Sequence, residues 1–306
     1  MRLLLLTNEG KWSGRVEYDC DLFLIGFREL LGGNAVDFPK RELLYKRWTL
    51  ADKQHLYGRG FTILSKTLPD ILDRSLSGQF DHVLYLGPRC ERYPQLHDRA
   101  GGPYFEIRHD ARTAHKQCTP LPMPLQGQLP EESPVFRWDG AKVRNLFAEH
   151  QDWPALPLGI PRHLVRPLHF DRDLVHQRSL PVEGGGQSPY PFTNEKDYYA
   201  ELSRCWFGLI CRKQRWDSLR LYEMLAMGAC VVFKNYDRKP PRAAPAQLPC
   251  FSVRDYAEVS RLYAAHIRAG KPSNEYLDMV QKQREWLLNN TADKVAGRVL
   301  EWIEKG

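Results

Sequence analysis

The sequence lacks an apolar run long enough to span a bilayer. It opens with Met1-Arg2 and four leucines, a positive charge followed by apolar residues, as at the start of a signal peptide. However, the apolar run ends at Thr7-Asn8-Glu9, too early for the hydrophobic region of such a peptide. We therefore interpret the leucines as a buried first strand and expect a cytoplasmic protein without a transmembrane segment.

The cysteines lack the spacing of a metal site. There are seven, an odd number, with no C-x-x-C pair and no Cys/His ligand pattern. Cys205, Cys211 and Cys230 lie inside apolar runs, which indicates free thiols in the core. We expect neither a structural zinc ion nor any other bound metal.

The glycine-rich phosphate loop of dinucleotide-dependent oxidoreductases is also missing. The first strand is followed by Thr7-Asn8-Glu9-Gly10-Lys11-Trp12, where such an enzyme would have G-x-G-x-x-G. This excludes a Rossmann-type oxidoreductase, and we expect no resident cofactor.

Negative charge is in short supply. The chain has 44 Lys and Arg against 37 Asp and Glu, a net charge of +7 and a pI near 9.0. This balance favours a polyanionic partner, such as a nucleotide, a nucleic acid or an acidic membrane surface touched peripherally. The alternative is a mildly basic enzyme without such a partner, because no long Lys/Arg block of the type found in nucleic-acid-binding tails is present.

Strands and helices alternate along the 306 residues, which predicts an α/β fold of two lobes with parallel sheets. The expected strands cover 2–7, 35–38, 82–86, 104–107, 206–211, 229–234 and 250–253, and the expected helices cover 19–31, 69–76, 198–205, 217–228, 255–268 and two segments from Ser273 onward, divided by a cap at Asn290 or Thr291. We expect an N-terminal domain at 1–155, a C-terminal domain at 156–290, and a terminal helix at 291–306 that packs back on the first. Residues 162–192 show no recognisable strand.

The most informative segment runs from Trp216 to Phe233. Ser218 opens an amphipathic helix, Gly228 ends it, and an apolar strand follows at once. Three cations, Arg212, Lys213 and Arg215, precede the helix and follow the preceding strand.

This order of elements predicts an anion site at the helix N-terminus. Ligands of open α/β sheets bind beyond the carboxyl ends of strands, where helix N-termini point. The free amides and the helix dipole suit a diphosphate, and Arg220 could add a bidentate phosphate contact. Glu223 lies three residues further on, where it could bind ribose hydroxyls or pair with Arg220 on the helix surface.

Ser218, Arg220, Glu223 and Gly228, followed by an apolar strand, resemble the donor-site segment of GT-B glycosyltransferases, in particular the exostosin-like and group 1 branches. The similarity covers roughly residues 194–256. It implies two Rossmann-like lobes facing a cleft, with C-terminal helices that cross back. It also implies a nucleotide diphosphate sugar as co-substrate, bound by residues of the segment 212–223, which includes Trp216, Asp217 and Leu219, with Glu223 on the ribose.

The sequence departs from the retaining members of these families. They carry a further glutamate seven or eight residues before the ribose-binding one, and here those positions are Trp216 and Arg215. Inversion of the sugar is therefore favoured. We also expect the transfer to need no metal ion.

An inverting reaction requires a base that removes the proton of the acceptor hydroxyl. The candidates are Asp19 and Asp21 at the start of the first helix, and His109 and Asp110 after the strand at 104–107. For the aspartates, helix capping is the alternative role.

The acceptor is left open between a surface glycan and a hydroxymethylated base in DNA, which an enzyme would have to flip out of the duplex. A different class of function is a nucleotide-binding or nucleic-acid-binding protein that keeps the fold without catalysing transfer.

Overall fold

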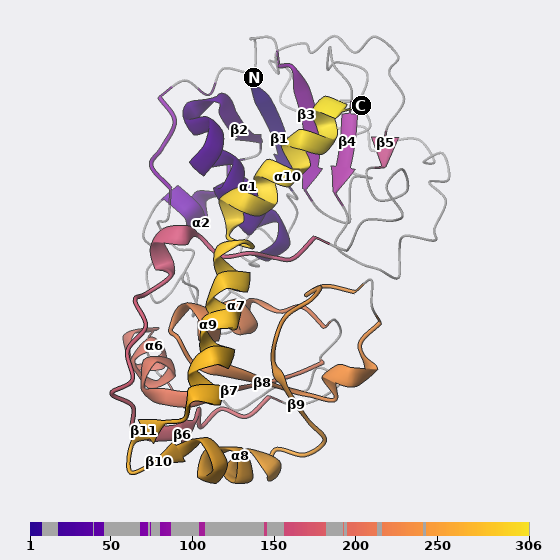
Figure 1. Ribbon diagram of the computed structural model, residues 1–306. Helices are drawn as coiled ribbons and strands as arrows, with labels where there is room; N and C mark the ends of the chain where they lie inside the picture. The colour runs from indigo at the N-terminus through magenta and orange to yellow at the C-terminus, as the bar shows by residue number, and fades with distance from the viewer. Residues whose placement is uncertain are drawn as a thin grey trace. The chain divides into compact units, whose positions relative to one another are not determined.

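The computed structural model describes residues 1–7, 18–38, 40–45, 68–72, 74, 80–86, 104–107, 144–145, 156–181, 192, 195–212, 216–240 and 243–305 (Figure 1). The chain divides into two compact units: Met1–Trp153 together with Ala296–Gly306, and Pro154–Val295. Each contains a parallel sheet with helices, so the α/β class is confirmed.

The first unit contains a 5-stranded parallel sheet of order β2-β1-β3-β4-β5. Its strands are β1 (Leu3–Thr7), β2 (Ala35–Phe38), β3 (His82–Leu86), β4 (Tyr104–Ile107) and β5 (Arg144–Asn145). Leu3, Leu4 and Leu5 are buried, as expected for a parallel strand covered on both faces.

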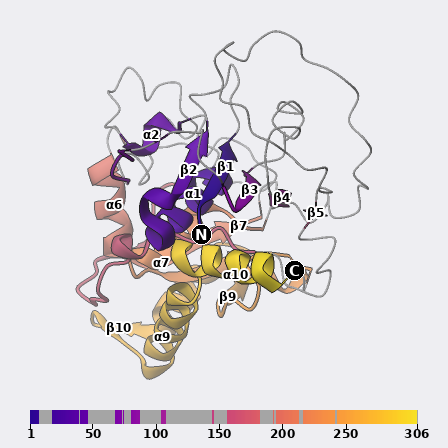
Figure 2. The ribbon, with the colours of Figure 1, turned by 90° about the horizontal axis from the view of Figure 1, so that it is seen from above.

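Helix α1 (Tyr18–Leu31) connects β1 to β2 and buries Leu24, Ile25 and Phe27, while the short helix α2 (Glu42–Tyr45) follows β2. The part of α10 (Ala292–Lys305) that belongs to this unit lies on the same face of the sheet as α1 (Figure 2). Gly297 of α10 faces Leu30 of α1.

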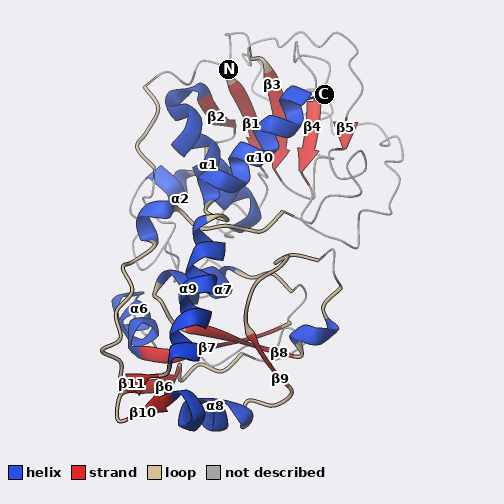
Figure 3. Ribbon diagram, viewed as in Figure 1, coloured by secondary structure: helices blue, strands red, loops and turns tan. Residues whose placement is uncertain are grey.

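The second unit contains a 4-stranded parallel sheet of order β6-β7-β8-β9 (Figure 3). Its strands are β6 (Leu174–His176), β7 (Cys205–Cys211), β8 (Cys230–Lys234) and β9 (Phe251–Val253); its helices are α6 (Glu195–Arg204), α7 (Leu219–Ala226), α8 (Glu258–His266) and α9 (Asn274–Leu288), with a hairpin of β10 (Ile267–Arg268) and β11 (Lys271–Pro272). All seven residues of β7 are buried.

Side chains alternate along β7 and so divide the helices between its two faces. Phe207 and Leu209 join a core cluster with residues of α8 and α9, such as Val259 and Tyr276. Gly208 faces the other way, where a Cβ would lie 2.7 Å from Sδ and 3.0 Å from Cβ of Met224 in α7. The glycine thus permits the close approach of α7 to β7.

A buried arginine joins the helix ends of this unit. Arg172, 7% exposed, donates hydrogen bonds to five backbone carbonyls: those of His169 (3.1 Å), Ser203 (2.9 Å), Cys205 (2.6 Å), Met227 (3.1 Å) and Gly228 (2.8 Å). Ser203 lies in the last turn of α6, and Met227 caps the C-terminus of α7. Because each helix C-terminus carries about half a negative charge, the two ends together offset the charge of the guanidinium.

The strands expected at 2–7, 35–38, 82–86, 104–107, 206–211, 229–234 and 250–253 are confirmed, within two residues at either end. So are the helices at 19–31, 198–205 and 217–228, although α6 begins three residues earlier and α7 is shorter by two residues at each end, and the two C-terminal helices. Cys205, Cys211 and Cys230 are buried and form no disulfide with the described cysteines, as expected.

Two expectations are wrong, and a third is confirmed only with different bounds. The described residues of the helix expected at 69–76, namely 69–72 and 74, are not helical, because they are tied individually to other segments through Pro69, Asp70 and Arg74. The helix expected at 255–268 begins at Glu258 and gives way to β10 after His266. Residues 162–192 do contain a strand, β6, which is too short for its alternation to be recognised.

Within the described ranges, no helix is both long and apolar enough to cross a membrane.

Candidate functional site

The start of α7 lies beside the carboxyl end of β7, as the sequence predicts. The chain leaves β7 at Cys211 and enters α7 at Leu219. Ser218 is the N-cap residue, with an extended backbone (φ −157°, ψ 145°). Within the described part of the chain its hydroxyl makes no capping hydrogen bond, so the side chain does not occupy the first-turn amides.

Asp217 binds the groups around this helix start. Its Oδ2 accepts hydrogen bonds from the backbone amide of Leu158 (2.9 Å) and from the hydroxyl of Tyr222 (3.1 Å). Its Oδ1 accepts from the amide of Ser218 (3.0 Å). Asp217 therefore fixes the beginning of α7 to the segment at 156–161.

An aromatic–cation row of five residues follows the carboxyl ends of β7 and β8: Arg212, Trp216, Phe233, Tyr236 and Lys239. The Arg212 guanidinium lies 5.7 Å from the centre of the Trp216 ring, and Lys239 Nζ lies 5.5 Å from that of Tyr236. Between them, the ring centres of Trp216 and Phe233 are 5.7 Å apart, and those of Phe233 and Tyr236 are 5.2 Å apart. The row brings two cations and two partly exposed rings to the edge at which α7 begins.

Lys239 is held in place by backbone carbonyls. Its Nζ donates to the oxygens of Ala243 (2.7 Å) and Pro240 (3.1 Å). Burial lowers the pKa of this ammonium group, and the nearby charge of Asp217 acts in the opposite direction. The result is a partly buried cation with a fixed position.

The two candidate residues inside α7 have partners from other elements. Arg220 Nη1 lies 3.4 Å from the carbonyl oxygen of Ser179. Glu223 is 4% exposed and accepts hydrogen bonds from Tyr199 (2.6 Å, to Oε1) and Tyr198 (2.9 Å, to Oε2), both on α6. Each carboxylate oxygen of Glu223 thus has a phenolic donor, and little of the side chain is open to a ligand.

Among the candidates for a base, Asp21 is fully buried on α1. Its Oδ1 accepts from Arg41 Nε at 2.8 Å, and both side chains are under 9% exposed. This places Asp21 in an ion pair. The side chain of Asp19, and all of His109, Asp110, Lys213 and Arg215, lie outside the described residues.

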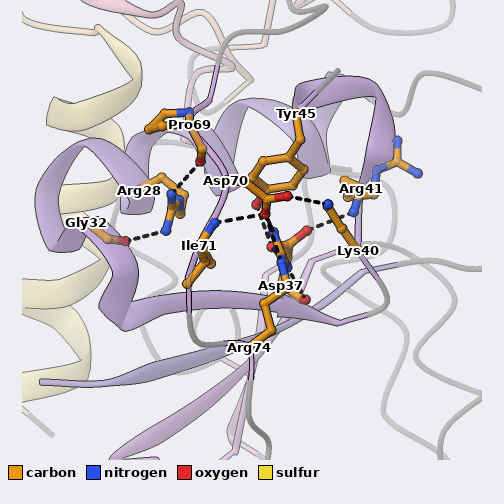
Figure 4. Close-up of polar contacts among 10 residues, drawn as sticks. All are labelled: Arg28, Gly32, Asp37, Lys40, Arg41, Tyr45, Pro69, Asp70, Ile71 and Arg74. Atoms are coloured by element: carbon orange, nitrogen blue, oxygen red, sulfur yellow. Dashed lines mark hydrogen bonds and ion pairs between the residues drawn. The ribbon is translucent and has the colours of Figure 1, made fainter. Parts of the chain in front are cut away.

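Sequence reasoning missed a polar cluster at the end of β2 (Figure 4). Asp37 is 2% exposed; its Oδ1 accepts from the Tyr45 hydroxyl (2.5 Å) and from Arg74 Nη1 (2.9 Å), and its Oδ2 accepts from the amide of Arg41 (2.8 Å). Arg74 also contacts Asp70. The signal in the sequence is a carboxylate within an apolar strand, which requires partners when it is buried.

Asp70 forms the exposed side of that cluster. Lys40 Nζ donates to its Oδ2 at 2.6 Å, and the amide of Ile71 donates to its Oδ1 at 2.8 Å (Figure 4). The hydrogen bond from Lys40, followed by those from Ile71 and Arg74, lowers the pKa of Asp70 to about 2. The cluster balances its own charges and fastens residues 68–72 and 74 to the end of β2.

Two Asp-x-Asp pairs are present in the chain, at Asp19–Asp21 and Asp171–Asp173. Asp21 pairs with Arg41, Asp173 pairs with Arg204, and Arg172 between the second pair points into the protein. In the part of the chain that the structure describes, no group of three or more His, Cys, Asp or Glu side chains is arranged to hold a metal ion.

Comparison with other proteins gives no assignment: no protein-family model matches the sequence, and no curated protein matches it.

Proposed function

We propose that the protein is a glycosyltransferase with two Rossmann-like lobes of GT-B type, which transfers a sugar from a nucleotide diphosphate sugar to an acceptor hydroxyl. The observation that carries the proposal is the junction of β7 and α7. There a helix begins at the carboxyl edge of a parallel sheet, its N-cap hydroxyl does not cap it, and the cations Arg212 and Lys239 lie in the adjoining aromatic–cation row.

In this proposal the diphosphate binds at the start of α7, where amides and cations stabilise the negative charge of the leaving group. Arg212, Lys213, Arg215 and Arg220 supply positive charge, and Ser218 supplies a hydroxyl. The reaction inverts the sugar without a metal ion, with a base from the first unit. The acceptor is a surface glycan or a hydroxymethylated base in DNA.

A thermal-shift screen of nucleoside diphosphates and their sugars tests the donor site. A ligand at 100 times its Kd stabilises the protein by about 2.7 kcal/mol, which raises Tm measurably. The variant Arg212→Leu should reduce the shift, whereas Arg261→Leu on α8 should not, because Arg261 lies outside the aromatic–cation row. If no nucleotide raises Tm, the proposal is wrong.

Glu223 favours a second candidate function, nucleotide binding without transfer. Because the side chain is 4% exposed and packed against Tyr198 and Tyr199, it contacts a ribose only if α6 or the carboxylate moves. Slow hydrolysis of a UDP-sugar without acceptor, reduced in Glu223→Gln but not in Glu258→Gln, would support the transferase. Tight nucleotide binding without any turnover would support the second candidate.

A further inference from the structure

We propose that Trp216 is the platform on which the planar aromatic base of a nucleotide stacks, with Arg212 as the cation that it displaces or that closes over it. The inference rests on the proposed function, because it names the part of the donor that this side of the site recognises.

The indole of Trp216 has one permanent and one replaceable neighbour. Phe233 is buried in β8 and cannot move without disturbing the sheet, and its ring centre is 5.7 Å from that of Trp216. Arg212 is exposed, and in the described part of the chain its only contact of this type is with the Trp216 ring. A ligand can therefore take the place of Arg212 at low cost.

The energies favour such an exchange. An exposed cation–π contact is worth about 0.5–1 kcal/mol, whereas stacking of a base on an aromatic side chain is worth about 1–3 kcal/mol. Insertion of a base between the two groups needs a separation of about 7 Å, twice the contact distance of about 3.5 Å, against 5.7 Å in the structure. Arg212 must then withdraw from the ring, which its exposure allows, and it remains as a second stacking surface.

The cations of the aromatic–cation row indicate that the ligand also carries negative charge. Neither Arg212 nor Lys239 has a carboxylate within ion-pair distance among the described residues, although Asp217 is close enough to affect Lys239. Lys239 is also held by two carbonyls, so it presents a fixed positive charge. A nucleotide matches this arrangement, because its base can stack on Trp216 while its phosphates lie toward the start of α7. A sugar phosphate has no base, so it matches only the phosphate part of the site.

The experiment compares the binding of UDP, ADP, GDP and inorganic pyrophosphate by isothermal titration calorimetry. We expect Trp216→Leu to weaken the best nucleoside diphosphate by roughly 10-fold or more and to change pyrophosphate binding by less than 2-fold. Trp216→Phe, which keeps a ring, should retain most of the affinity. Trp302→Leu, on α10, is the control for loss of a tryptophan.

A second readout does not depend on the folding of the leucine variant. A base stacked on the indole should quench part of the tryptophan fluorescence of the wild-type protein, and Trp216→Phe should remove that part. Equal nucleotide affinity in the wild type and in Trp216→Leu, or quenching that persists in Trp216→Phe, overturns the platform but leaves the donor site intact. Failure of all four ligands to bind the wild type overturns the donor site as well.

Discussion

Replacement of Arg172 by methionine should strongly destabilise the second unit. Methionine keeps much of the apolar stem and removes the guanidinium, so the change isolates the five hydrogen bonds to backbone carbonyls. Burial lowers the pKa of Arg172, because removal of the guanidinium from water disfavours its charged form.

The magnitude follows from these contacts. A hydrogen bond to a charged group contributes about 1.5–3 kcal/mol, so five of them exceed what a single residue can contribute net. The desolvation of the guanidinium, several kcal/mol, offsets part of that sum. We expect a net loss of about 3–5 kcal/mol, because each carbonyl oxygen left buried without a donor costs about 1–3 kcal/mol, against a total stability of about 5–15 kcal/mol. Arg172→Lys keeps the charge but not the planar fork of donors, so its loss should be smaller.

Amide hydrogen exchange locates the effect. In Arg172→Met the amide of Leu209, in β7 of the second unit, should lose protection, while the amide of Leu5, in β1 of the first unit, should keep it. Urea unfolding followed by circular dichroism gives the accompanying loss of free energy. A loss below about 1 kcal/mol would refute the reasoning, since the desolvation cost would then cancel the hydrogen bonds.

Three further changes test the packing and the backbone geometry of the second unit. Gly208→Ala should cost about 1–3 kcal/mol in urea unfolding, since the new methyl meets Met224, and Met224→Ala in the same chain should recover part of that loss; additive losses would contradict the contact. Gln283→Leu should cost about 2 kcal/mol, because its amide both donates to and accepts from the backbone of Val231 in β8, and an unchanged Tm would argue against that pairing. Gly270→Ala should cost about 1 kcal/mol from backbone strain alone, because φ is +72° and no atom lies within 4 Å of the added methyl. A loss above about 3 kcal/mol would contradict this explanation, because strain alone does not account for it.

Local patterns in the sequence predict most of the described elements. The apolar run at 205–211 is sufficient to predict a strand, because a parallel strand buried on both faces is continuously apolar. Ser218 and Gly228 mark the two ends of a helix, and the apolar residues after Gly228 indicate the next strand. Where the signal is short or the element is fixed by distant partners, prediction fails. Strand β6 has 3 residues, and residues 69–72 are held by side chains of Arg28 and Lys40 rather than by a helix.

The position of α7 directly after β7 could be predicted from the sequence, but the contacts of its residues could not. The sequence indicates that Asp217, Arg220 and Glu223 stand at the start of a helix beside a strand end. It does not contain the information that Tyr198 and Tyr199 reach Glu223 from α6, since residues 24 and 25 positions apart meet only through the packing of the two helices. The role of Asp37 was missed for the same reason.

The hydrogen bonds of Asp217 connect the start of α7 to the segment at 156–161. The same carboxylate holds the amide of Ser218 and that of Leu158, and the next segment is joined by the bond from the Ala292 amide to the carbonyl of Ile160. A phosphate that takes the Ser218 amide away from Asp217 also repels that carboxylate and loosens its hold on Leu158. Anion binding at the start of α7 and the position of residues 156–161 are therefore expected to be coupled through this one carboxylate.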